Sequence, residues 1–361
     1  MSDSEFVGTT PVRAGHGFDV GALERYLKAN VDGFKGKLEV EQFKGGQSNP
    51  TFLLKLDGIS RYVLRKKPAG PLLPSAHAVD REYRVMKALA GTDVPVAPMI
   101  LLCEDPEIIG TAFFVMGFVE GRSFWDPRLP DLTNAQRASI YAELNRVIAA
   151  LHKVDYAAVG LDDYGKPGNF FVRQIGRWTK QYRASETGRI EAMESLIAWL
   201  PENIPPGDET ALVHGDYRLD NTLFHPTEPR ILAVVDWELS TLGHPLADFA
   251  YHVMVWRFRP EEFRGLAGVD LDALGIPNES QYIRSYCERT GRDLIDPADW
   301  DFYLAYNMFR LACIRQGILK RALEGNASSQ QAEEVGRRAG ETAMSAWRIV
   351  ENMANKKRAE I

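Results

Sequence analysis

The chain carries two kinds of hydrophobic pattern, and the first is an alternation of apolar and polar residues. Three runs between residues 37 and 67, KLEVEQF, TFLLKLDG and RYVLRKK, place apolar side chains mostly at every second position. This period predicts β-strands. Asp57-Gly58, between the second and third runs, is a turn dipeptide and predicts an antiparallel hairpin. Two further apolar runs, APMILLCED and GTAFFVMGFVEG, are expected to complete the sheet.

The second pattern has the period of a helix. It occurs first in VGALERYLKAN, ahead of the strands, and again between Ser75 and Ala90, where Val79, Tyr83, Met86 and Leu89 share one face. Beyond Gly121 it dominates. The segment NAQRASIYAELNRVIAALHKV and the stretches around 189–200, 245–257 and 299–323 are its main examples.

Three short strand-like pieces, ALVHGD, NTLFHP and RILAVVDWE, interrupt the helical part. The pattern therefore predicts an α+β, bilobal fold with a small antiparallel-sheet lobe and a large helical lobe. We place the first lobe at residues 1–118 and the second at residues 119–361.

Composition narrows the classes of function. The chain has 361 residues with 45% hydrophobic and 25% charged side chains, and 43 basic against 49 acidic residues give a net charge of −6. An acidic balance argues against nucleic-acid or membrane-surface partners. Three scattered cysteines suggest no disulfide framework, and no secretory leader or membrane span is recognisable. A cytoplasmic protein with a small-molecule substrate is expected, while the oligomeric state stays open.

Candidate chemistry centres on the stretch LVHGDYRLDNTLF. Asp216 and Asn221 are spaced so that the aspartate could accept a hydroxyl proton while the asparagine oxygen binds a Mg²⁺ ion. Asp236, at the end of the apolar run ILAVVD, could supply a second carboxylate to metals on the β- and γ-phosphates of a nucleotide. The apolar runs on either side would hold these ligands on rigid strand ends.

This stretch allows two other interpretations. Gly-Asp and Asp-Asn are ordinary turn residues, so a plain β-turn is one of them. The other is a hydrolytic metal site, because histidines and carboxylates suit zinc or manganese. Such a site would use His214, Asp216, Asp236, His244 and Asp248. It would leave the N-terminal lobe without a role, so phosphoryl transfer is favoured.

The N-terminal lobe offers matching nucleotide-binding features. A loop between the first two strands could cradle phosphate oxygens through its backbone N–H groups, and it contains Gly45, Gly46, Gln47, Ser48 and Asn49. Arg65 follows on the strand RYVLRK, where a cation would touch the α- and β-phosphates, and Glu82 could hold that cation. Alternatively, Arg65 or Lys66 is a solvated edge charge and Glu82 an exposed helix residue. Adenine would bind to backbone atoms near Met116 to Phe118.

These motifs resemble the aminoglycoside phosphotransferase-like branch of the protein-kinase superfamily. More narrowly, they resemble the kinase-like domains fused to acyl-CoA dehydrogenases. The matching pieces span roughly residues 35 to 320 and include GGQSNPTF, YVLRKKP, REYRVMKAL, FVMGFVEGR, LHKVD, LVHGDYRLDN, VVDWELSTLGHPLADFAY and FRLACIRQG.

The resemblance implies ATP and Mg²⁺ as cofactors, Asp216 as catalytic base, and Asn221 and Asp236 as magnesium ligands. It also implies that Asp248 braces the catalytic loop. One position departs from the pattern, because protein kinases have lysine where this chain has Arg65. Whether Arg65 or Lys66 reaches the phosphates is therefore left open.

The acceptor is the least explicit part of the sequence. Aminoglycosides are polycations and would favour a strongly acidic helical lobe. The net charge of this chain is only modestly negative, so it does not point to such a substrate. That lobe is rich in aromatic and basic residues, including Trp125, Trp178, Tyr182, Trp256, Arg257, Tyr303, Asn307 and Arg310. Tyr303, Asn307 and Arg310 are the candidate acceptor ligands, with core packing as the alternative for the aromatic side chains.

Arg310 lies in an apolar helical run, where a charge needs a partner. That partner is either a neighbouring carboxylate or an anionic group of the substrate. The resemblance points to a hydroxy acid or a hydroxyacyl-CoA as the acceptor. An aminoglycoside- or choline-type small-molecule kinase, or a nucleotide-binding scaffold without transfer activity, are the alternatives.

Overall fold

The computed structural model describes residues 8–44, 49–68, 78–325 and 331–359. By its internal contacts the chain forms two compact units, each described separately below. Unit 1 comprises residues 1–147, 157–161 and 218–240, and unit 2 comprises residues 148–156, 162–217 and 241–361. Helix α4 (Asn134–His152) begins in unit 1 and ends in unit 2.

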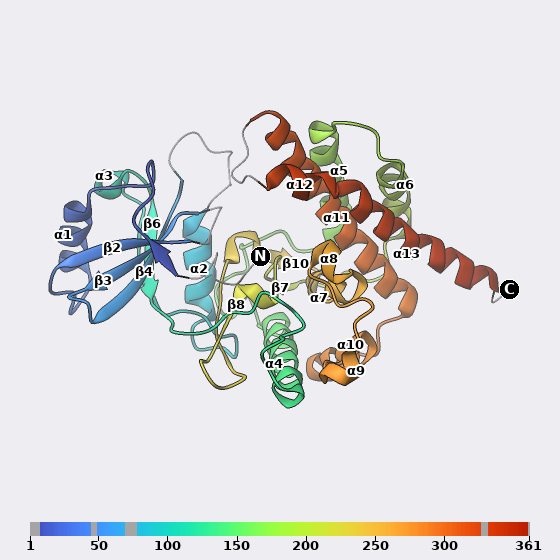
Figure 1. Ribbon diagram of the computed structural model, residues 1–361, viewed down its shortest axis with the longest axis horizontal. Coiled ribbons are helices and arrows are strands. Elements are labelled where there is room, and N and C mark those ends of the chain that lie inside the picture. The colour runs from blue at the N-terminus through green and yellow to red at the C-terminus, as the bar shows by residue number, and fades with distance from the viewer. Residues whose placement is uncertain (1–7, 45–48, 69–77, 326–330, 360–361) are drawn as a thin grey trace. The chain divides into compact units, whose positions relative to one another are not determined.

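A six-stranded antiparallel sheet is the centre of unit 1 (Figure 1). The strand order is β1-β2-β3-β4-β6-β5, and the strands are β1 (Thr9–Thr10), β2 (Leu38–Phe43), β3 (Thr51–Leu56), β4 (Ser60–Lys66), β5 (Met99–Cys103) and β6 (Phe113–Gly117). The predicted hairpin is confirmed, since Leu56 pairs with Ser60 across the turn. Asp57 and Gly58 adopt left-handed φ angles of 47° and 70°, which Asp and Gly tolerate better than most residues.

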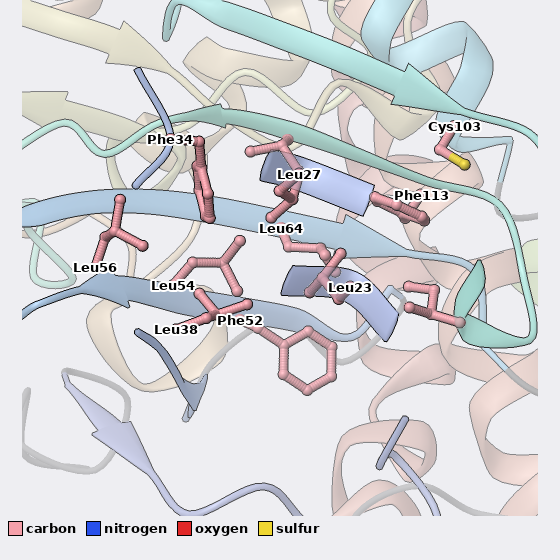
Figure 2. Close-up of a cluster of buried hydrophobic side chains, with 12 residues drawn as sticks. Leu23, Leu27, Phe34, Leu38, Phe52, Leu54, Leu56, Leu64, Cys103 and Phe113 are labelled. Carbon is pink, nitrogen blue, oxygen red and sulfur yellow. The ribbon is translucent and has the colours of Figure 1, made fainter. Parts of the chain in front are cut away.

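Helices α1 (Val20–Asn30) and α2 (Val79–Leu89) lie on opposite sides of this sheet (Figure 1). Leu23 and Leu27 of α1 pack into an apolar cluster with alternate residues of the strands, among them Phe52, Leu54 and Leu64 (Figure 2). Because neighbouring strand residues point to opposite faces, the residue after Leu64 projects toward α2. The face toward α2 is also largely apolar, with Val63 and Phe114 buried there, and it is on this face that Arg65 lies.

A β-ribbon completes the described part of unit 1. It pairs β8 (Thr222–Phe224) with β9 (Ile231–Val234), and it is flanked by two short helices, η3 (Leu219–Asn221) and η4 (Trp237–Leu239). The Trp237 indole donates a 2.9 Å hydrogen bond to the carbonyl oxygen of Val234. This bond holds the chain in a tight turn directly after β9.

Unit 2 is helical apart from one small antiparallel pair, β7 (Ala211–Val213) with β10 (Thr241–Gly243). Its longer helices are α5 (Phe170–Ser185), α6 (Glu191–Trp199), α7 (Pro245–Val253), α10 (Glu279–Thr290), α11 (Pro297–Leu323) and α13 (Ala339–Ala359). Helix α11 is the central one, with sixteen buried residues. Within the described residues, no helix is both long enough and apolar enough to cross a membrane. The predicted α+β organisation, with an antiparallel sheet in one part of the chain and mainly helices in the other, is confirmed.

Candidate functional site

The loop that follows β7 is held by Asp248 of α7, inside unit 2. The two Asp248 oxygens accept backbone N–H groups of His214 and Gly215, each at 2.8 Å. His152 Nε2 lies 3.2 Å from the same carboxylate, and its Nδ1 lies 2.7 Å from the Tyr286 hydroxyl. Burial alone would raise the pKa of Asp248, but His152 and the N–H of His214 outweigh it and lower that pKa.

Asp216 stands at the end of this loop and is half-buried. Gly215, with a φ of 82°, provides the left-handed turn that precedes it. Asp216 Oδ1 accepts a 2.7 Å hydrogen bond from the Tyr251 hydroxyl, and the Asp216 backbone N–H donates to His214 Nδ1 at 3.2 Å. Tyr251 lies in the apolar run DFAYHV, whose pattern predicts a core residue, so its contact with Asp216 is visible only in the structure.

Arg310 of α11 also contacts this loop. Its guanidinium donates a 2.7 Å hydrogen bond to the Gly215 carbonyl oxygen and lies 4.8 Å from the Tyr251 ring and 5.6 Å from the Trp178 ring. Cation–π contacts of this kind are favourable by roughly 0.5 to 2 kcal/mol. Within the described residues, no aspartate or glutamate forms an ion pair with Arg310.

The two other candidate acceptor residues lie deeper in unit 2. Tyr303 is buried and stacks on Phe171 with a ring separation of 5.4 Å, and burial raises the pKa of its hydroxyl. Asn307 is 1% exposed, and its amide donates to the carbonyl oxygens of Ala247 and Tyr303 at 2.8 and 2.9 Å. The structure therefore places Tyr303 and Asn307 among packed side chains, whereas Arg310 is half-exposed. A role for the three in acceptor binding stays a prediction.

In unit 1, the side chain of Arg65 links α2 to the turn after β9. Its Nε lies 2.9 Å from Glu82 Oε2, and a terminal nitrogen lies 2.7 Å from Asp236 Oδ1 and 3.8 Å from Glu238 Oε2. Asn49 donates a 2.8 Å hydrogen bond to Glu82 Oε1. The structure thus brings together four residues predicted from the sequence, Asn49, Arg65, Glu82 and Asp236, and adds Glu238, for which the sequence gives no signal.

In this cluster the Arg65 guanidinium faces three carboxylates, those of Glu82, Asp236 and Glu238. Burial raises the pKa of Glu82 to about 7, and Asp236 and Glu238 add to the rise while Arg65 opposes it. Burial would lower the pKa of Arg65, but the three carboxylates outweigh it and raise that pKa. Arg65 is therefore charged at neutral pH.

Lys66 is the other basic residue that the sequence left open as a phosphate contact. It follows Arg65 in β4 and so projects from the opposite face of the sheet. It is buried, and burial lowers its pKa. Of the two residues, Arg65 is the one whose side chain meets Glu82 and Asp236.

The predicted metal ligands Asn221 and Asp236 lie at one end of the β8–β9 ribbon. Thr222 pairs with Val234 at that end, and the Val235 N–H donates to the Asn221 carbonyl oxygen at 2.9 Å. Asp236 has a left-handed backbone with φ 67° and ψ 57°, which turns its carboxylate toward Arg65. Carboxylate and amide oxygens are the donors that Mg²⁺ prefers, so these residue types fit that ion.

The alternative of a hydrolytic metal site gains no support from the geometry. Across the described ranges, no group of three or more His, Cys, Asp or Glu side chains is arranged to hold a metal ion. Both Asp248 oxygens already accept loop N–H groups, and His244 caps α7 by accepting the N–H of Leu246 at 3.2 Å. These two residues have structural partners in unit 2.

The remaining nucleotide-binding predictions concern two segments of unit 1. Met116 lies in β6, paired with Val63 on one side. The N–H of Phe118 donates to the Arg61 carbonyl oxygen at 3.3 Å, and the Arg61 guanidinium lies 4.3 Å from the Phe118 ring. Four predicted residues of the phosphate-binding loop lie outside the described residues, namely Gly45, Gly46, Gln47 and Ser48.

Comparison with known proteins adds an independent line of evidence. Residues 39–281 match the sequence model of the phosphotransferase enzyme family. Acyl-CoA dehydrogenase family member 10 of Mus musculus is 48% identical over 343 residues, which cover 94% of this chain and 32% of that protein. Family member 11 of Gallus gallus is 46% identical over 336 residues, covering 91% of this chain and 43% of that protein. The chain spans less than half the length of these curated relatives.

Solved structures extend the comparison to the fold. A Ralstonia eutropha protein, provisionally described as an aminoglycoside phosphotransferase, is 58% identical with a TM-score of 0.86, covering 93% of this chain and 99% of its own. An aminoglycoside phosphotransferase bound to ADP and hygromycin B is 17% identical with a TM-score of 0.56, covering 90% and 98%. Plasmodium vivax ethanolamine kinase is 15% identical with a TM-score of 0.57, covering 88% and 85%. The last two likenesses concern the fold alone.

Proposed function

We propose that this chain, which belongs to the phosphotransferase enzyme family, uses ATP and Mg²⁺ to phosphorylate a hydroxyl group of a small metabolite. The observation that carries the proposal is the Arg65 cluster. One guanidinium joins Glu82, at 2.9 Å, to Asp236, at 2.7 Å. In phosphoryl-transfer enzymes a cation held by a helix carboxylate contacts the nucleotide phosphates, and a nearby aspartate holds the metal.

In the proposed reaction, the acceptor oxygen attacks the γ-phosphorus, the bond from that phosphorus to the β-phosphate oxygen breaks, and ADP leaves. Asp216 takes the proton of the acceptor hydroxyl. Asn221 and Asp236 would hold Mg²⁺, which neutralises charge on the β- and γ-phosphates. Arg65 would bind the α- and β-phosphates, and its Glu82 partner fixes the position of the guanidinium. Adenine would bind at the backbone near Met116 and Phe118.

The acceptor that we propose is a hydroxy acid or a hydroxyacyl-CoA. Arg310 supports an anionic acceptor, because it touches the loop of Asp216 and pairs with no described carboxylate. The relatives named as acyl-CoA dehydrogenases support an acyl substrate. An amino alcohol or an aminoglycoside is the second candidate, favoured by the fold shared with an ethanolamine kinase and a hygromycin B complex. The three free, buried cysteines are consistent with the reducing cytoplasm as the place of action.

A nucleotide-binding scaffold without transfer activity is separated from the enzyme by two measurements. Thermal unfolding is followed with ATP in the presence of Mg²⁺ or EDTA, and ADP release is then measured with hydroxy acids, their CoA thioesters, aminoglycosides and choline. We expect a magnesium-dependent rise in melting temperature and faster ADP release with one acceptor class. Asp216→Asn should keep the thermal shift and lower the turnover about 10²- to 10⁴-fold. Binding without any acceptor-dependent ADP release would favour the scaffold.

A further inference from the structure

We infer that Tyr251 is a positioning residue for Asp216, orienting the carboxylate that takes the acceptor proton. This inference rests on the proposed function. Its starting observation is the 2.7 Å hydrogen bond from the Tyr251 hydroxyl to Asp216 Oδ1. Tyr251 is 5% exposed, and a phenol has one proton to donate. That proton is directed at the proposed base.

Helix α7 contacts the catalytic loop through two residues that are neighbours on one face of the helix. Asp248 and Tyr251 are three residues apart and therefore neighbours on the helix surface. Asp248 accepts the backbone N–H groups of His214 and Gly215, each at 2.8 Å. Asp248 thus fixes the backbone of the loop, and Tyr251 fixes the side chain at its end. One rigid helix sets both, so the carboxylate keeps its direction relative to the loop.

The ring of Tyr251 is itself restrained by α11. The guanidinium of Arg310 lies 4.8 Å from the ring centroid and donates a 2.7 Å hydrogen bond to the Gly215 carbonyl oxygen. Arg310 therefore contacts both the tyrosine and the residue just before Asp216. Moving the Tyr251 ring away from Asp216 would also break its contact with Arg310 of α11. The hydrogen bond is consequently part of a constrained arrangement within unit 2.

A base held in position accelerates proton transfer more than an equally basic but mobile one, because the transfer requires hydrogen-bond geometry at the moment of attack. A hydrogen bond to a charged group also stabilises the ionised carboxylate. Removing the Tyr251 hydroxyl should therefore slow the chemical step and leave nucleotide binding, which depends on unit 1 residues, unchanged. A purely structural tyrosine would instead lower the melting temperature and affect turnover only through folding.

The test compares Tyr251→Phe with Tyr282→Phe in the full chain, using steady-state ADP release. Tyr282 is the matched control, because it is also buried in unit 2 and its hydroxyl lies 2.7 Å from a different side chain, His252 Nε2. We expect Y251F to lower kcat about 10- to 100-fold, the range for losing a hydrogen bond to a charged group. The KM for ATP should stay within about twofold of wild type, and Y282F should keep the wild-type kcat.

A double-mutant cycle with Asp216→Asn decides whether Tyr251 acts through Asp216. We expect Y251F to cost nothing further in the D216N background, because the group that it orients is gone. Additive losses, or a Y251F enzyme with wild-type kcat, would overturn the inference. The inference would also be overturned if Y282F lowered kcat as much as Y251F does and both variants lost the same amount of melting temperature. A wild-type protein that neither binds Mg-ATP nor releases ADP would instead overturn the proposed function, and this inference with it.

Discussion

Arg65 and Asp236 are 171 positions apart in the sequence, yet their side chains meet at 2.7 Å. This contact ties the central sheet of unit 1 to the β-ribbon that carries Asn221. The Asp236 side chain is 36% exposed, whereas the Arg65 side chain is 10% exposed. The Asp236 carboxylate is therefore accessible to a ligand in solvent, while the buried Arg65 guanidinium holds that carboxylate in place.

Replacing Asp236 with alanine should weaken ATP binding only where magnesium is present. The other proposed ligand, Asn221, has a neutral oxygen, which would bind Mg²⁺ less strongly than a carboxylate. Because Asp236 is partly exposed, its ion pair with Arg65 should contribute no more than about 1 kcal/mol to stability. Calorimetric titration of ATP at several Mg²⁺ concentrations measures the effect. An affinity that depends on magnesium as in wild type would remove Asp236 from the metal site.

Removing the Arg65 charge should be far more damaging to stability. Arg65→Met would leave Glu82 buried with two further carboxylates nearby, and breaking a buried pair costs about 3 to 5 kcal/mol. The double variant R65M/E82Q should recover part of that loss, because position 82 then no longer carries a buried carboxylate that lacks its partner. Urea denaturation of the wild type, R65M and R65M/E82Q at neutral pH measures both effects. If E82Q fails to restore any stability to R65M, the buried ion pair is not the source of the loss.

The contrast between Arg65 and Tyr251 indicates what a sequence can reveal. Alternation along β4 predicts that Leu64 and Arg65 face opposite sides, and motif order places Glu82 on the following helix. Asp248 was likewise expected to brace the catalytic loop. Tyr251 could not be found in this way, because its role depends on which residue the apolar face of α7 meets after folding. The short strand β10 and the contact of Arg310 with Gly215 are tertiary features of the same kind.

Two buried histidines predict how stability changes with pH. Burial lowers the pKa of His244 and of His252 to about 4 in the folded chain, from the ordinary value of 6.5. The unfolded chain therefore binds more protons between pH 6.5 and 4, so the free energy of unfolding should fall as the pH decreases through that window. Glu82 opposes this trend, because its raised pKa favours the folded state at low pH.

His252→Gln isolates one of these contributions. The substitution removes the titrating group, so the loss of stability between pH 7 and pH 4.5 should shrink by roughly 2 to 3 kcal/mol, at 1.36 kcal/mol per pKa unit. Denaturant unfolding of wild type and variant at the two pH values provides the measurement. A pH dependence identical in both proteins would show that His252 does not remain neutral when folded.

Arg310 allows the charge of the acceptor to be tested. If its guanidinium binds an anionic group, Arg310→Met should lower kcat/KM for a hydroxy acid about 10- to 100-fold, the usual loss for a hydrogen bond to a charged group. The contact with Gly215 complicates this result, because a disturbed loop would slow every acceptor. The informative quantity is therefore the ratio of kcat/KM for a hydroxy acid to that for its uncharged amide, in which a general loop effect cancels.

Two further variants make the interpretation of that ratio secure. Arg310→Lys keeps the positive charge and should retain part of the preference for the acid, although a lysine cannot reproduce the planar, bidentate geometry. Arg177→Met is the matched control, since the Arg177 guanidinium lies 5.8 Å from the same Trp178 ring but, among the residues that the structure describes, donates no hydrogen bond to the loop of Asp216. We expect R177M to retain most of the acid preference. An R310M enzyme that loses activity equally on the acid and the amide, with a lower melting temperature, would show that Arg310 only braces the loop. The acceptor would then have to be sought among neutral or cationic alcohols.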